Sequence, residues 1–221
     1  MTLLLPSSPR SYEDAIIDTV RFRREYDINR INGRLIEPII KRNLMYVNGY
    51  DEHNRGILYV KFSEKIQTIS GTQDYLRSVL LTALHSVERV DRLSTMKGSA
   101  EFVVVIDLNG LSWKTCPPLK TMSLAIGFLK RHFPYRLHAI YIVNASVIFD
   151  TIWKLIKPTV PARTLRKTFV LRKKEDAALL LRKLGDGLEE DYGGKTKVPD
   201  FNDERIFSQY TAPLGPEYYR H

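Results

Sequence analysis

The sequence predicts an α/β fold with a mixed, mainly parallel β-sheet flanked by helices. Segments with the patterns of strands and of helices alternate along the chain, as in βαβ units, where a helix joins two parallel strands. Residues 102–108 (FVVVIDL) form a continuous apolar run, which is typical of a parallel strand covered on both faces. The chain has 221 residues, of which 43% are hydrophobic, so it suits one domain with a sizeable core.

The chain begins with a short helical segment, predicted over residues 1–45. Residues 11–26 place apolar side chains near one helical face and acidic side chains in the first turn, the end where the helix dipole favours negative charge. Residues 36–42 predict a second, short helix. Residues 46–56 are rich in turn signals such as Asn-Gly, and residues 57–62 (ILYVKF) predict the first strand.

Residues 46–194 hold the rest of the predicted sheet and its helices. Ser70 and Gln73 form a capping box that starts a helix reaching about residue 92. After the strand at 102–108, two prolines start a helix at 117–132, and short strands follow at 139–143 and 168–171. Further helices are expected at 146–157 and 175–184. The tail, residues 195–221, contains three prolines and is expected to pack as an irregular strap or to stay mobile.

The helix at 146–157 has a broad apolar face, ended by Pro158. At about 100° per residue, one face carries six large apolar side chains and the other is polar. Such a face needs an apolar partner, which is a protein core, a ligand or a bilayer. The periodicity alone favours an ordinary core helix. The six residues are Ile148, Phe149, Ile152, Trp153, Leu155 and Ile156.

Positive charge is concentrated from the last turns of this helix onward. The net charge is +9, and the stretch from Lys154 to Lys174 contains Lys and Arg but no acid. Such a run is either a solvated surface, a contact for an anionic membrane or a contact for nucleic-acid phosphates. The neighbouring amphipathic helix favours the membrane, and no nucleic-acid recognition motif is present.

No catalytic, cofactor or metal site is predicted. The chain lacks a G-x-G-x-x-G or P-loop motif, its five histidines show no metal-like pairing, and Cys116 lacks the Arg six positions later that a phosphatase loop requires. A single cysteine fits a reducing compartment, and no apolar run is long enough to span a bilayer. We therefore expect a soluble, cytoplasmic, non-enzymatic protein.

Several motifs, in the right order, resemble the CRAL-TRIO lipid-binding family, in its phosphatidylinositol-transfer-protein-like form. They are Asp107 with Gly110, the FPYR turn at 133–136, IYIVNAS at 140–146 and the Tyr-Gly-Gly at 192–194. The resemblance covers residues 46–194 and implies a shortened N-terminal helical region. It also implies a hydrophobic lipid cavity on the sheet, closed by a gate helix at 146–157.

The resemblance implies binding of a single lipid or lipophilic molecule, and leaves transfer between membranes open. The alternative is a protein-interaction or regulatory module on the same fold; no protein partner is predicted. The expected pocket walls are Val104, Ile106, Leu124, Phe128, Tyr141, Val143, Ile148, Phe149, Ile152 and Trp153. The expected contacts with an anionic membrane, in peripheral and transient association, are Phe149, Trp153, Lys157, Arg163 and Arg166.

The resemblance also names a head-group site. Thr164 and Lys167 match the family's Thr-x-x-Lys pattern for phosphatidylinositol, but Tyr135 stands where the family has an acid. Phosphatidylcholine is excluded, because each unpaired polar group would cost about 1–3 kcal/mol. We expect a sterol-like, isoprenoid or fatty-acyl ligand at least as strongly as phosphatidylinositol. The four apolar residues at the family's polar choline positions are Val47, Leu58, Phe102 and Val104.

Overall fold

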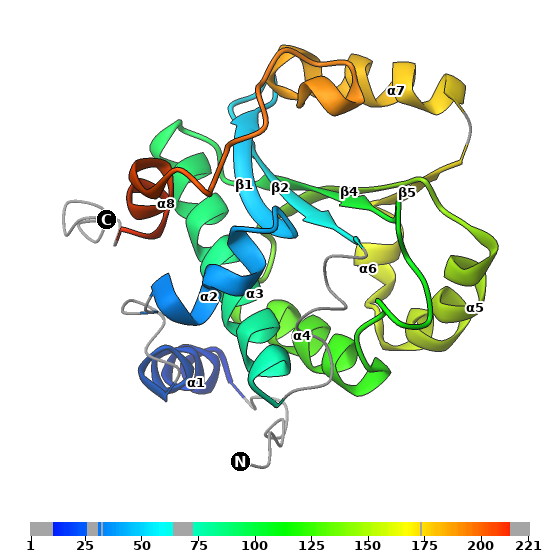
Figure 1. Cartoon of the computed structure of the whole chain (residues 1–221). Helices are drawn as coiled ribbons and strands as arrows, with labels where there is room; N and C mark the ends of the chain where they lie inside the picture. Colours follow the sequence, from blue (N-terminus) through cyan, green and yellow to red (C-terminus); the bar gives the residue numbers. More distant parts are fainter. Residues whose placement is uncertain (1–10, 26–30, 32, 64–72, 173, 213–221) are drawn as a thin grey trace.

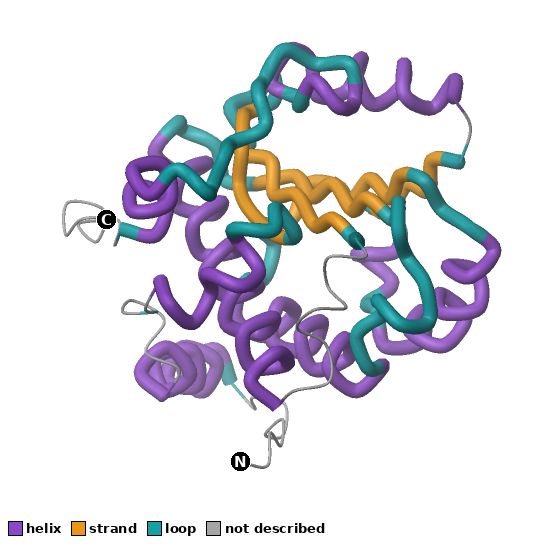
Figure 2. Tube along the Cα trace, in the orientation of Figure 1, coloured by secondary structure: helices purple, strands orange, loops and turns teal. Residues whose placement is uncertain are grey.

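One five-stranded sheet crosses the middle of the molecule, with helices on both of its faces (Figures 1 and 2). The computed structural model describes residues 11–25, 31, 33–63, 73–172 and 174–212. The strand order is β1-β2-β3-β4-β5. β1 pairs antiparallel with β2, and all the other neighbours are parallel. The expectation of a mixed, mainly parallel sheet flanked by helices is confirmed.

The strands lie close to their predicted positions, with one exception. They are β1 (Met45–Tyr50), β2 (Gly56–Lys61), β3 (Phe102–Asp107), β4 (Leu137–Val143) and β5 (Thr168–Leu171). β1 was expected to be a turn. Its Asn-Gly pair is instead inside the strand: Gly49 has φ 73°, and a Cβ there would lie 2.1 Å from the Gly187 carbonyl oxygen. Gly49 is thus needed for close packing.

The longer helices also fall near their predicted bounds. They are α1 (Tyr12–Glu25), α2 (Gly33–Ile40), α3 (Gln73–Met96), α4 (Leu119–His132), α5 (Val147–Ile156) and α7 (Lys174–Leu184). A short helix, α6 (Ala162–Leu165), lies between α5 and β5 and was not expected. Ser70, the predicted start of α3, lies outside the described residues. No described helix has the length and apolar character needed to cross a bilayer.

The two faces of the sheet have different partners. α7 lies over one face, while α3, α4, α5 and α6 lie on the other (Figure 1). Tyr59, Val105 and Tyr141 are aligned across β2, β3 and β4. The Tyr59 hydroxyl accepts a hydrogen bond from Glu189 N, which follows α7. Because side chains alternate along a strand, these three face α7.

The C-terminal segment is more ordered than expected. Residues 204–211 form a helix, α8 (Glu204–Thr211), whose Phe207 and Tyr210 are buried in the main core together with Phe201. The Tyr210 hydroxyl accepts a hydrogen bond from Val47 N in β1 (2.9 Å). The segment therefore covers the edge strand, which is a common protection against edge-to-edge pairing. Residues 213–221 lie outside the described part.

Candidate functional site

Helix α5 lies against the sheet through part of its apolar face. Phe149 and Ile152 are 5% and 4% exposed. They pack with Leu108, Leu111 and Ile142 in an apolar cluster separate from the main core. We call this group and the partly buried side chains around it the gate cluster. The partly buried members are Phe62, Ile106, Cys116, Met122, Ile140, Ala145, Ile148, Trp153, Ile156 and Val170.

The floor beneath α5 is only partly covered. β3 and β4 are inner strands, so their apolar side chains are expected to be fully buried on both faces. On the α7 face, Val103 and Val105 are indeed completely buried. On the α5 face, Val104, Ile106 and Ile140 all remain partly exposed. The described side chains therefore leave this apolar floor partly exposed, and a hydrophobic ligand requires such an apolar surface.

Six of the predicted pocket walls belong to the α5 side of the sheet. Five are members of the gate cluster, namely Ile106, Ile148, Phe149, Ile152 and Trp153. Val104 shares their side because it lies two residues before Ile106 in β3.

Three of the remaining predicted walls lie elsewhere. Tyr141 and Val143 project from the opposite, α7 face, because β4 pairs them with Val105 and Asp107; the residues of β4 that face α5 are Ile140 and Ile142. Phe128 packs in another cluster with Phe22, Leu80 and Leu84. The structure thus places these three residues away from the gate cluster. For Tyr141 and Val143 the reason is that β4 is apolar on both faces, so the phase of its alternation is not visible in the sequence. The side chain of Leu124 lies outside the described set.

The head-group candidates lie at the amino-terminal end of β5 and in the turn before β4. Lys167 is already engaged: its Nζ lies 3.3 Å from Glu101 Oε1, and it donates to the Leu137 carbonyl oxygen. Thr164 is partly buried, and its carbonyl oxygen accepts from Lys167 N (3.0 Å). Tyr135 is exposed with φ 65°, and the Arg163 guanidinium lies 4.4 Å from its ring centre. Tyr135 thus contacts Arg163 instead of Lys167.

Glu101 places a carboxylate beside Lys167, and sequence reasoning did not identify it. It directly precedes β3, far from Lys167 in the chain, so only the fold brings the two together. Burial tends to raise the pKa of the Glu101 carboxyl, but hydrogen bonds from His138 and Lys167 outweigh burial and hold that pKa below its usual value. The carboxylate is therefore charged at neutral pH and neutralises Lys167.

A chain of polar contacts continues along this edge of the sheet. His138 Nδ1 lies 2.9 Å from Glu101 Oε2 and 2.8 Å from Arg55 Nη1. Arg55 Nε in turn donates to Asp51 Oδ2 (2.6 Å). Together with Lys167, these residues form a row of polar and charged side chains at the amino-terminal ends of β2 to β5, which we call the polar edge. Its basic and acidic side chains are paired with one another.

The predicted membrane contacts are only partly at the surface. Phe149 points toward the sheet and is buried, so its assignment as a membrane contact was wrong. The apolar residues of α5 that do face outward are Val147 (81% exposed) and Leu155 (55% exposed). Trp153 is half-buried; Lys157, Arg163 and Arg166 are exposed.

The Tyr-Gly-Gly and Asp107 motifs serve the fold. Asp107 accepts hydrogen bonds from Tyr192 Oη (2.8 Å) and Asn144 Nδ2 (2.7 Å), and a Cβ on Gly194 would lie 1.8 Å from the Leu188 carbonyl oxygen. Nearby, Lys61 pairs with the completely buried Glu189 at 2.8 Å. The Asp107 and Glu189 carboxylates are each held by partners within the fold. Among the described residues, no cluster of His, Cys, Asp and Glu could hold a metal ion.

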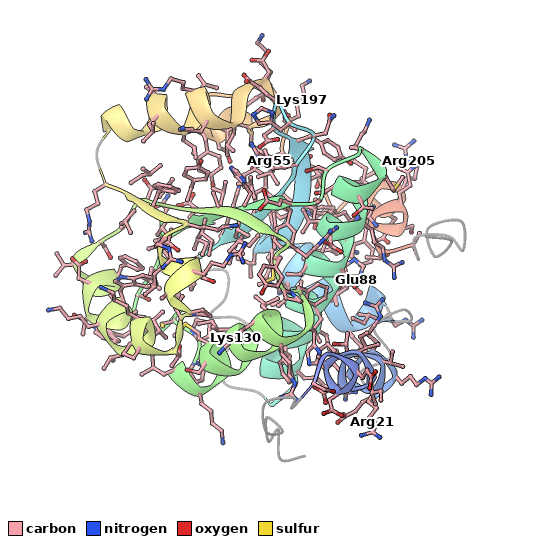
Figure 3. All side chains as sticks on the ribbon, turned by 180° about the vertical axis from the view of Figure 1, so that it is seen from behind. Arg21, Arg55, Glu88, Lys130, Lys197 and Arg205 are labelled. Carbon is pink, nitrogen blue, oxygen red and sulfur yellow. The ribbon has the colours of Figure 1, made fainter. Side chains whose placement is uncertain are left out.

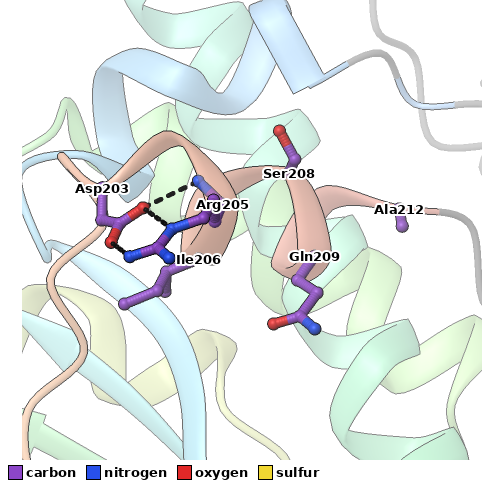
Figure 4. Close-up of a pocket in the computed structure, with 6 residues that line it drawn as sticks. All are labelled: Asp203, Arg205, Ile206, Ser208, Gln209 and Ala212. Carbon is purple, nitrogen blue, oxygen red and sulfur yellow. Dashed lines mark hydrogen bonds and ion pairs between the residues drawn. The ribbon is translucent and has the colours of Figure 1, made fainter.

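A pocket of about 660 Å³ lies on α8, away from α5 (Figure 4). Its polar wall includes the Asp203–Arg205 ion pair at 2.9 Å, and its apolar lining is limited to Ile206 and Ala212. None of the predicted pocket walls lines it. The complete lining is Asp203, Arg205, Ile206, Ser208, Gln209 and Ala212.

Comparison with known proteins agrees with this geometry. The crystal structure of Sfh5 superposes with a TM-score of 0.66 at 22% identity, covering 95% of this chain and 76% of that one, which shows a shared fold. The SEC14 cytosolic factor of Candida glabrata is 24% identical over 89% of this chain and 68% of that protein. The phosphatidylinositol transfer protein SFH5 of Saccharomyces cerevisiae is 31% identical over 50% of this chain and 37% of that protein. A family model described as the CRAL/TRIO domain matches residues 40–194. Since this match spans well over half of the sequence, the chain belongs to the CRAL/TRIO domain family.

Proposed function

We propose that this chain binds one lipid or lipophilic molecule between the sheet and α5, and that it does no covalent chemistry on it. The observation that carries the proposal is the partial exposure of Val104, Ile106 and Ile140 on inner strands. Apolar surface at the centre of a sheet is normally covered, and an apolar ligand would cover it here. Relatives that are named as phosphatidylinositol transfer proteins support the same class of ligand.

Helix α5 is suited to act as the gate of this pocket. It holds the sheet through Phe149 and Ile152, and it is bounded by Asn144, with φ 55°, and by Pro158. Its outward side presents Val147 and Leu155, and exposed basic residues follow it. An apolar surface next to a basic one favours contact with an anionic bilayer. We therefore propose peripheral membrane association of a cytoplasmic protein, with lipid entering or leaving under α5.

The polar edge bears on the choice of ligand. A phosphorylated head group at Thr164 and Lys167 has to compete with Glu101, because Glu101 already holds the Lys167 ammonium. The choline positions Val47, Leu58 and Phe102 are buried and apolar. We therefore propose that phosphatidylcholine is not bound, that phosphatidylinositol is bound weakly, and that a more hydrophobic ligand fits better.

The test is lipid retention by the purified protein, measured by organic extraction and mass spectrometry. Wild type should retain about one lipid per chain. Ile140→Trp, which fills the space over the floor, should lose the lipid, whereas Thr151→Trp on the outward side of α5 should retain it. Circular dichroism and thermal unfolding check that both variants fold. An empty wild type, or equal retention in both variants, contradicts the proposal and favours an interaction module on the same fold.

A further inference from the structure

Helix α1 is fixed to the body through one face. Phe22 is buried and stacks on His132 of α4 with ring centres 3.8 Å apart. Arg23 forms an ion pair with Glu88 of α3 at 2.8 Å, and Arg131 pairs with Asp18. The inner face of α1 is therefore held by both aromatic stacking and ion pairs.

The opposite face of α1 is apolar and open. We define the outer stripe as Glu13, Ile16, Ile17, Val20 and Arg24, which lie within an arc of about 100°, opposite Phe22. Ile16 and Ile17 are each 49% exposed and Val20 is 43% exposed. Single exposed apolar residues are ordinary, but here three share one stripe of one helix. α1 lies at the periphery of the molecule in both views, and Arg21, beside the stripe, points away from the body (Figures 1 and 3).

The charges at the two ends of the stripe indicate what covers it. Glu13 is at the amino-terminal end and Arg24 at the carboxyl-terminal end, and both are exposed. Neither forms an ion pair with another described residue. The spacing of Glu13, Ile17, Val20 and Arg24, four then three then four residues, is that of the contact seam between two packed helices. The stripe is thus a seam with an acid at one end and a base at the other.

We propose that the outer stripe binds the outer stripe of a second copy of this chain, with the two α1 helices antiparallel. In this arrangement Glu13 of each copy meets Arg24 of the other, and Ile17 of each copy meets Val20 of the other. Two ion pairs then flank a central apolar contact. A parallel pair would instead place acid against acid and base against base. The contact is isologous, as in most two-fold dimers, and it is independent of lipid in the pocket under α5.

The size of the stripe sets the strength of the association. A helix of 14 residues is about 21 Å long, and one such helix buries less than the roughly 1,200–2,000 Å² of a stable interface. The dimer is therefore weak, depends on protein concentration, and dissociates further as salt screens the Glu13–Arg24 pairs.

The test is sedimentation equilibrium of the full chain with charge reversals in the stripe. Glu13→Arg leaves basic residues at both ends of the stripe, and Arg24→Glu leaves acids at both ends. Each variant alone should associate at least tenfold more weakly than wild type, and the double variant should recover. An equimolar mixture of the two single variants should form a heterodimer. Asp14→Arg is the matched control: it makes the same change in the same helical turn but off the stripe, so it should associate like wild type.

Three outcomes would overturn the proposal. The first is a wild type that stays monomeric at all concentrations. The second is a mixture of the two single variants that fails to associate although both remain helical by circular dichroism. The third is a monomer whose binding to phosphatidylcholine vesicles is lost in Ile17→Asp, which would assign the stripe to a bilayer. Loss of association in Ile17→Asp together with heterodimer formation by the charge variants would establish the paired stripes.

Discussion

At the scale of single residues, we propose that Glu101 and Lys167 set how tightly an anionic head group binds. Glu101 lies 3.3 Å from Lys167, where a phosphate would have to bind. Glu101→Gln keeps the size of the side chain and removes its charge, so transfer of labelled phosphatidylinositol between vesicles should rise a few-fold, as expected for loss of a partly exposed ion pair worth about 0.2–1 kcal/mol. Lys167→Ala should abolish the transfer.

Two results would contradict this view of the polar edge. Phosphatidylinositol transfer by Lys167→Ala at the wild-type rate would remove Lys167 from the head-group site. Robust transfer of phosphatidylcholine would refute the argument from the buried apolar residues Val47, Leu58 and Phe102.

A second prediction for a single residue concerns the buried ion pair beside the Tyr-Gly-Gly motif. Glu189 is completely buried and depends on Lys61 Nζ at 2.8 Å for its countercharge. Lys61→Ala leaves this carboxylate buried and unpaired, which should lower the free energy of unfolding by about 3–5 kcal/mol. Lys195→Ala is the matched control. Its ion pair with Asp186 is largely exposed, so its loss should cost under about 1 kcal/mol. Urea unfolding measures both, and equal losses would contradict the prediction.

At the scale of elements, α5 should direct membrane docking through its outward side. Leu155→Asp removes an exposed apolar side chain worth about 1.5–3 kcal/mol when buried, so co-sedimentation with anionic liposomes should fall about tenfold or more. Thr151→Asp adds the same charge to the same side of the helix and should reduce binding only a few-fold. Binding should also weaken with salt. Equal effects of the two variants, or binding indifferent to salt and lipid charge, would contradict this role.

The elements also show how far the sequence determines the site. The bounds of α5, β3 and β5 were predicted to within a residue or two, because each is a run of mainly apolar residues with polar or charged residues beside it, and Pro158 follows the end of α5. Which residues of β4 face α5 was not predictable, since Ile140 and Tyr141 are equally apolar and only the register with β3 separates them. Glu101 meets Lys167 only through the pairing of distant strands. α8 was missed because the prolines around it suggested irregular structure.

At the scale of the whole molecule, two histidines should make the fold sensitive to mild acid. Burial, with Arg89 acting in the same direction and Glu88 against it, lowers the pKa of His85 to about 4. Its Nε2 is buried with no hydrogen-bond partner among the described residues. Burial also lowers the pKa of His132 to about 4, with Arg131 acting in the same direction and Asp18 against it. These histidines lie on α3 and α4, the helices that hold α1 and the sheet together.

The sign of the effect follows from proton binding. Both imidazoles are neutral in the fold at neutral pH, whereas in the unfolded chain a histidine binds a proton below about pH 6.5. Between about pH 6.5 and pH 4 the unfolded state therefore holds more protons, and stability falls as the pH falls. For His85 the loss at pH 5 is about 1–2 kcal/mol, and for the partly buried His132 it is smaller because solvent screens its charge. The urea midpoint of unfolding should drop between pH 7 and pH 5 in wild type, and this drop should be smaller in His85→Gln. His53→Gln is the control: His53 is exposed, so this variant should show the same drop as wild type. A drop of the same size in all three proteins would show that these buried histidines do not set the acid sensitivity.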